Sequence, residues 1–137
     1  MTSYPYLRAY LAGIAAPTAY LPFGLIAFIA AQRAGMLPVA LERVIVFPMA
    51  MVPNLWGLWN VLYVALARRG ARWPIGFHGA TLPVLLLPAG VLLTHALKIE
   101  LFTPQRLAAI LPFALILYYL VWKYVVGFLN RLLGVQS

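Results

Sequence analysis

Four long apolar runs, separated by short polar segments, dominate this chain. Each run has about 22 residues, which at about 1.5 Å per residue gives roughly 33 Å, enough to cross a hydrocarbon core of about 30 Å. The runs are continuously apolar, whereas a strand of a membrane barrel alternates apolar and polar positions. The sequence therefore predicts an all-α polytopic membrane protein, a four-transmembrane-helix bundle forming a single domain over residues 1–137. The predicted spans are residues 10–31, 44–66, 75–97 and 107–129.

The composition agrees with a chain that is solvated by lipid. Hydrophobic residues make up 65% of the sequence and charged residues only 9%, against roughly a quarter charged in soluble domains. Cysteine is absent, which excludes disulfides, thiolate metal sites and cysteine nucleophiles. The formal net charge is +8, but the cations lie between apolar runs, so we expect them to contact anionic lipid head groups and not nucleic acid.

The distribution of Lys and Arg predicts the orientation of the helices. Arg68, Arg69 and Arg72 form a tight cluster in the middle loop, on the same side as Arg8 and Arg131 near the chain ends. Short cytoplasmic loops carry an excess of Lys and Arg. We therefore expect a multi-pass protein of the cell (inner) membrane with both termini in the cytoplasm. The three arginines of the middle loop are the predicted contacts with anionic head groups.

Pairs of prolines five residues apart recur inside the first three spans. An interior proline removes a backbone donor and its ring presses on the preceding turn, so each pair predicts a kinked helix. Two interpretations stay open, namely kinked packing and a mid-membrane cavity lined by broken helices. The predicted kink positions are Pro17, Pro22, Pro48, Pro53, Pro83 and Pro88.

The first and third spans share a longer pattern that indicates an internal repeat. Glycines and prolines recur at a constant offset of 66 residues. Such a match suggests two duplicated helical hairpins related by a pseudo-two-fold axis along the membrane normal. The second and fourth spans resemble each other poorly. The matching residues are Gly13, Pro17, Pro22 and Gly24 in the first span and Gly79, Pro83, Pro88 and Gly90 in the third.

The second span contains the most polar and aromatic stretch of any predicted helix. Asparagine amides in lipid need hydrogen-bond partners, and glycine lets two helix backbones approach closely, so this stretch is typical of a helix-packing or oligomer interface. Aromatic walls with amide anchors would also suit a ligand site. The candidates for either role are Asn54, Trp56, Gly57, Trp59, Asn60 and Tyr63.

The few titratable residues do not predict a metal site, a cofactor site or an active site. His78 and His95 are 17 residues apart on one span, about 25 Å along the axis, so one helix cannot bring both to one metal. We expect both to be interfacial histidines. His95, Glu42 and Glu100 fall on the face opposite the termini, where they could share a site, but each acid has a basic neighbour in its loop, which favours neutralised loop charges.

The sequence therefore favours a non-catalytic function. No acidic or basic residue falls near the centre of a span, where a proton-coupled transporter keeps its carboxylate. The leading hypothesis is a self-associating subunit, or an accessory or scaffold subunit of a larger membrane complex, packing through the Asn54 to Tyr63 face. The alternative is a small oligomeric channel or carrier for a neutral or anionic solute or a lipid.

Overall fold

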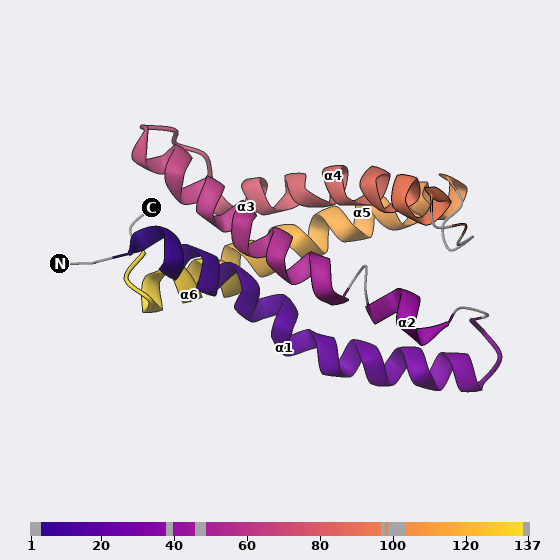
Figure 1. Cartoon of the computed structure of the whole chain (residues 1–137). Helices are drawn as coiled ribbons and strands as arrows, with labels where there is room; N and C mark the ends of the chain where they lie inside the picture. The colour runs from indigo at the N-terminus through magenta and orange to yellow at the C-terminus, as the bar shows by residue number, and fades with distance from the viewer. Residues whose placement is uncertain (1–3, 38–39, 46–48, 97, 99–103, 136–137) are drawn as a thin grey trace.

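The chain is described by a computed structural model over residues 4–37, 40–45, 49–96, 98 and 104–135, and these residues form helices and turns without any strand (Figure 1). Helices α5, η2 and α6 follow one another directly and make one continuous helix, in which η2 is a single turn of π-helix. The elements are α1 (Pro5–Arg33), α2 (Leu41–Val44), α3 (Ala50–Arg68), α4 (Ile75–Ala96), α5 (Pro104–Val121), η2 (Trp122–Val126) and α6 (Gly127–Leu132).

Four of these helices are long and apolar enough to cross a membrane, which confirms the predicted four-helix membrane bundle. They are α1, α3, α4 and the continuous helix from Pro104 to Leu132. The first helix begins five residues earlier than predicted, at Pro5, where proline suits the first turn because its missing amide has no helical partner there. The second span is described as α3 from Ala50, with the separate short helix α2 before it, and Pro48 lies outside the described residues.

Both chain termini lie at one end of the bundle, together with the loop of residues 69–74 (Figure 1). We call this the terminal end. Helices α1 and α4 end, and α5 begins, at the opposite end, which we call the far end. The first hairpin consists of α1, α2 and α3, and the second consists of α4, α5, η2 and α6.

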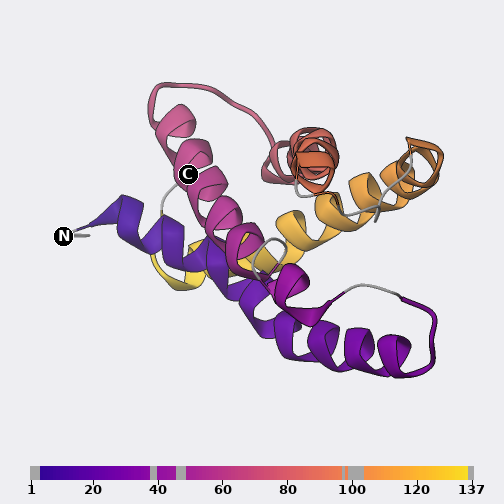
Figure 2. The same ribbon diagram turned by 45° about the vertical axis from the view of Figure 1, so that its right-hand side comes forward.

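The two hairpins touch near the terminal end and diverge toward the far end (Figure 2). The buried hydrophobic residues form two clusters, one around Trp56 and Trp122 and one of Ala9, Val64 and Val135. The buried residues of α1 all lie between Ala9 and Ala16, in its first half, and none of residues 104–121 of α5 is buried. The core of this protein is therefore concentrated in the terminal half of the bundle.

Glycines allow the helices of each hairpin to approach closely. A Cβ added to Gly13 would lie 2.6 Å from the Trp56 carbonyl oxygen, and one added to Gly57 would lie 2.6 Å from the Tyr10 ring. In the second hairpin, a Cβ at Gly79 would overlap the Trp122 side chain. Gly13 and Gly79, which the sequence marked only as matching positions of the predicted repeat, therefore serve close helix packing. Helix α1 also bends near its middle, where Pro17 and Pro22 lie, but which of the predicted prolines cause kinks stays a prediction (Figure 1).

The C-terminal turn closes the terminal end of the bundle. Gly134 adopts a positive φ of 65°, which lets the Val135 amide donate to the Asn130 carbonyl oxygen at 2.8 Å. This turn directs the Val135 side chain against Ala9 and Val64, where it is buried. Arg8 of α1 donates to the Leu133 carbonyl oxygen at 3.3 Å and ties the two ends of the chain together.

Candidate functional site

A pair of buried asparagines joins the two hairpins. The Asn60 Nδ2 donates to the Asn130 Oδ1 at 2.7 Å, and the Asn130 Nδ2 donates back to the Asn60 Oδ1 at 3.1 Å. The Asn60 Nδ2 also donates to the Ala9 carbonyl oxygen of α1 at 2.7 Å. Both amides are buried, with Asn60 entirely covered. Because an amide in a membrane core has no water to bond, this arrangement satisfies both side chains only while the hairpins stay together.

A second reciprocal contact links α3 to α4. The Trp59 Nε1 donates to the His78 carbonyl oxygen at 2.9 Å, and the His78 Nε2 lies 2.9 Å from the Trp59 carbonyl oxygen. Since a carbonyl only accepts, Nε2 must carry the proton of this imidazole. The His78 ring also stacks on the Trp59 ring with centroids 5.0 Å apart. The His78 side chain is buried against α3 inside the bundle, and its expected depth at the membrane interface stays a prediction.

Aromatic rings fill the space between the hairpins on the far-end side of this contact. The Trp56 ring lies 4.8 Å from the Tyr118 ring and 5.5 Å from the Trp122 ring, measured between centroids. The Trp56 Nε1 donates to the Tyr118 hydroxyl oxygen at 3.3 Å. Trp122 is entirely buried, and its Nε1 has no hydrogen-bond partner among the described residues.

The residues predicted in the second span divide between these contacts. Gly57 and Asn60 face α1, whereas Asn54 is exposed, accepts a hydrogen bond from the Tyr10 hydroxyl and donates to the Ala50 carbonyl oxygen at 2.7 Å. Trp56 is buried, and Trp59 and Tyr63 are half-buried beside His78. Much of this stretch is thus occupied by contacts within the chain, and its role toward a ligand or another subunit stays a prediction.

Sequence reasoning missed four participants in these contacts, namely Asn130, His78, Tyr118 and Trp122. One signal was available for Asn130, because Gly57-Leu58-Trp59-Asn60 has a counterpart in Gly127-Phe128-Leu129-Asn130. A signal was also available for Trp122, which lies 66 residues after Trp56, the offset of the predicted repeat. No comparable signal identifies His78 or Tyr118.

A cleft of about 410 Å³ opens between the diverging hairpins. Its walls come from α1, α3 and α5, and their side chains are apolar except for two tyrosine hydroxyls and the indole N–H of Trp56. The cleft lies on the far-end side of the aromatic cluster, of which Trp56 and Tyr118 are shared members. The lining residues are Pro17, Tyr20, Leu21, Gly24, Val52, Trp56, Leu117, Tyr118 and Val121.

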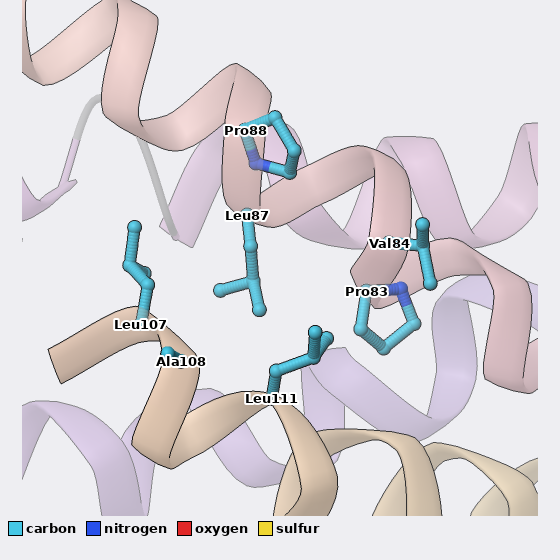
Figure 3. A pocket seen from close by; sticks show the side chains of 7 residues that line it. All are labelled: Pro83, Val84, Leu87, Pro88, Leu107, Ala108 and Leu111. Atoms are coloured by element: carbon cyan, nitrogen blue, oxygen red, sulfur yellow. The ribbon is translucent and has the colours of Figure 1, made fainter. Parts of the chain in front are cut away.

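A smaller groove of about 240 Å³ lies within the second hairpin, between α4 and α5. Side chains of the two helices face each other across it (Figure 3). Each of the two hollows is lined by the first proline of a predicted pair. This residue is Pro83 in the groove and Pro17 in the larger cleft. This groove is lined by Pro83, Val84, Leu87, Pro88, Leu107, Ala108 and Leu111.

No charged side chain is among the described residues that line either hollow. Lys123 lies over the rings of Tyr119 and Tyr124, at 5.5 and 5.3 Å from their centroids, and Arg68 lies 5.5 Å from the Tyr6 ring centroid. In each contact a cation lies beside an aromatic ring, to whose face it is attracted.

No metal-binding group is assembled in the described part of the chain. Three His, Asp or Glu side chains never come together there, and Glu100 lies outside the described residues. The described residues therefore place a largely apolar cleft beside a polar contact between the hairpins. Comparison with protein-family models, curated proteins and solved structures finds no match to this chain.

Proposed function

We propose that this protein is a non-catalytic membrane protein that binds the apolar part of a lipid in the cleft between its two hairpins. The observation that carries the proposal is the cleft itself, whose volume of about 410 Å³ falls within the range of about 300 to 1,000 Å³ typical of ligand sites. The sequence suggested two functions, namely a self-associating or accessory subunit and a channel or carrier for a solute or a lipid. This proposal is the lipid-binding version of the second.

The character of the lining favours a lipid over a solute. A water-soluble molecule crossing a membrane needs polar or charged groups along its path. The cleft instead presents Pro17, Leu21, Leu117 and similar side chains, and lipid tails match such walls in polarity. A lipid is therefore the favoured occupant.

Native mass spectrometry of the protein extracted with its surrounding bilayer tests this proposal. Gly24→Leu is the decisive variant, because Gly24 lines the cleft and a Cβ there meets no described atom within 4 Å, so a larger side chain can fill the hollow without a clash. Ala19→Leu is the matched control, since Ala19 is exposed on another face of α1. We expect a bound lipid with the parent chain and the control, and its loss from Gly24→Leu. Equal lipid retention by all three would contradict the proposal.

A second candidate is an accessory or self-associating subunit, the leading hypothesis from the sequence. It is favoured by α5, in which none of residues 104–121 is buried by the rest of the chain and large side chains such as Phe113 and Ile116 are exposed. In the same mass spectra, a stoichiometric second copy or a different membrane subunit, with no lipid, would support this candidate.

We further propose that the terminal end faces the cytoplasm of a cell with an inner membrane. This end carries Arg68, Arg69 and Arg72 in its loop, and cytoplasmic loops are enriched in such residues. These arginines would contact anionic lipid head groups at that surface.

The internal repeat is also a proposal, and the helix contacts support it. Gly13 packs on Trp56, and Gly79 packs on Trp122. Both members of the first contact are 66 residues from their counterparts in the second, the offset already seen between the first and third spans. The pairing of Trp56 with Trp122 adds the second and fourth spans to the repeat.

A further inference from the structure

The lining of the cleft contains a hydroxyl group whose proton has no acceptor. Tyr118 Oη accepts a hydrogen bond from the Trp56 Nε1 at 3.3 Å, and this bond holds the phenol in place. No described residue accepts the proton of the Tyr118 hydroxyl. A polar group without a partner is costly where no water is present, so an occupant that accepts this proton would bind better than one that does not.

This hydroxyl belongs to a residue at the centre of a span. Tyr118 is the middle residue of the 29-residue helix from Pro104 to Leu132. The ester oxygens of an ordinary phospholipid lie near the membrane surface, about 15 Å from the middle of a core that is about 30 Å thick. A phospholipid therefore brings only methylene groups to this depth, and a charged head group is excluded by the cost of burying it.

The walls around the hydroxyl are aromatic. Trp56 from α3 and Tyr118 from α5 lie 4.8 Å apart between centroids, with their planes inclined at 56°, and Tyr20 from α1 also lines the cleft. Flat rings pack well on such walls, in offset or tilted arrangements. The favoured occupant is thus flat at the end that reaches the Tyr118 hydroxyl and apolar elsewhere.

We infer that the cleft binds a neutral lipid whose planar ring carries a carbonyl oxygen, which is the chemistry of a quinone with an apolar tail. The ring lies between Trp56 and Tyr20, and the carbonyl oxygen accepts the Tyr118 hydroxyl proton. The tail leaves through the open side of the cleft toward the bilayer. This inference rests on the proposed lipid-binding function and narrows it to one ligand class.

The test uses the full chain in nanodiscs made from quinone-free phospholipid, titrated with decylubiquinone and followed by quenching of tryptophan fluorescence. We expect saturable binding of one molecule per chain. Gly24→Leu should abolish the saturable phase, and Ala19→Leu should keep it. Tyr118→Phe removes only the hydroxyl and should weaken binding by about three- to tenfold, the effect of one hydrogen bond. The exposed Tyr124→Phe should bind as the parent chain does.

Decylbenzene, which has a ring and the same tail but no carbonyl, separates the inference from the proposed function. It should compete weakly against decylubiquinone in the parent chain and should bind Tyr118→Phe as well as it binds the parent. Equal competition by decylbenzene, or an unchanged affinity of Tyr118→Phe for decylubiquinone, would overturn the carbonyl contact. If Gly24→Leu loses the bound phospholipid and the parent chain binds no quinone, the proposed function would still be supported and this inference would be overturned. A second copy of the chain filling the cleft would overturn both.

Discussion

The hydrogen bonds between Asn60 and Asn130 make a quantitative prediction about how the hairpins are held together. Asn60 takes part in three hydrogen bonds, two with Asn130 and one with the Ala9 carbonyl oxygen, and Asn130 takes part in the two that they share. Side-chain hydrogen bonds inside membranes contribute about 0.6 kcal/mol each on average. Asn60→Leu should therefore lower the free energy of unfolding by about 2 kcal/mol, and Asn130→Leu by about 1 kcal/mol.

The double variant should show that the two amides act as one unit. Asn60→Leu breaks three hydrogen bonds and Asn130→Leu breaks two of the same three. The double variant therefore breaks three hydrogen bonds and not five. Its loss of stability should be about 2 kcal/mol, not the sum of about 3, which gives a coupling free energy of about 1 kcal/mol. Leucine and asparagine have the same number of side-chain heavy atoms, and the steric cost of each single variant recurs in the double variant, so the coupling free energy reports mainly on hydrogen bonding.

Reversible unfolding in mixed micelles, followed by tryptophan fluorescence, measures these four stabilities. The control cycle pairs Asn54→Leu with Asn130→Leu, because Asn54 is exposed and, among the described residues, its side chain bonds to Tyr10 and Ala50 and not to Asn130. The control cycle should be additive within about 0.5 kcal/mol. If the Asn60 and Asn130 variants were equally additive, the two amides would not bond each other in the folded protein, and the account of the hairpin contact would fail.

Three further predictions address packing, the Trp59 contact and orientation. Gly79→Ala places a methyl group in the space of the Trp122 ring and should cost about 1 to 3 kcal/mol of stability in the same unfolding assay, whereas Gly24→Ala, in open space, should cost nothing. Trp59→Phe keeps a ring on His78 but removes the donor to its carbonyl oxygen, so it should cost about 1 kcal/mol; an unchanged stability would refute a role for that bond. Because the chain has no cysteine, Ala71→Cys and Ala34→Cys give clean labelling sites, and an impermeant maleimide added outside intact cells with a permeable outer envelope should modify only Ala34→Cys.

The hydropathy pattern predicted the architecture because lipid imposes the same requirement on every span. A continuous apolar run of the right length must be a helix that satisfies its own backbone, whatever its neighbours are. The predicted span of residues 75–97 and the helix α4, Ile75–Ala96, accordingly agree closely. The predicted starts of the first and fourth spans were less accurate. These helices begin earlier, at Pro5 and Pro104, because proline suits a first turn and the helix extends past the last lipid-facing residue.

The contacts between helices could be predicted only in part. The second span was recognised as polar and aromatic, but the partner of Asn60 lies 70 residues away and one residue beyond the predicted end of the fourth span. His78 was assigned from its place near a helix end, and its burial depends on α3 lying beside it. A mid-membrane cavity beside the prolines was one of the two interpretations left open by the sequence. The width of the cleft could not be predicted, since it is set by the angle between two hairpins and not by any local pattern.

The proposed repeat places the proposed site at a pair of corresponding positions that now carry different residues. At the offset of 66 residues, Val52 corresponds to Tyr118, and both line the cleft from opposite hairpins. The site would thus lie near the axis relating the two halves, where a strictly symmetric protein would have two valines or two tyrosines. A tyrosine on one side alone supplies a single hydroxyl, and the small valine opposite leaves room beside it. Duplication followed by divergence at this one pair would add the Tyr118 hydroxyl to a largely apolar cleft, whose other tyrosine hydroxyl belongs to Tyr20. Reversing the pair, with Val52→Tyr and Tyr118→Val together, should therefore disturb quinone binding more than folding, because it retains the total side-chain volume but removes the hydroxyl that Trp56 holds.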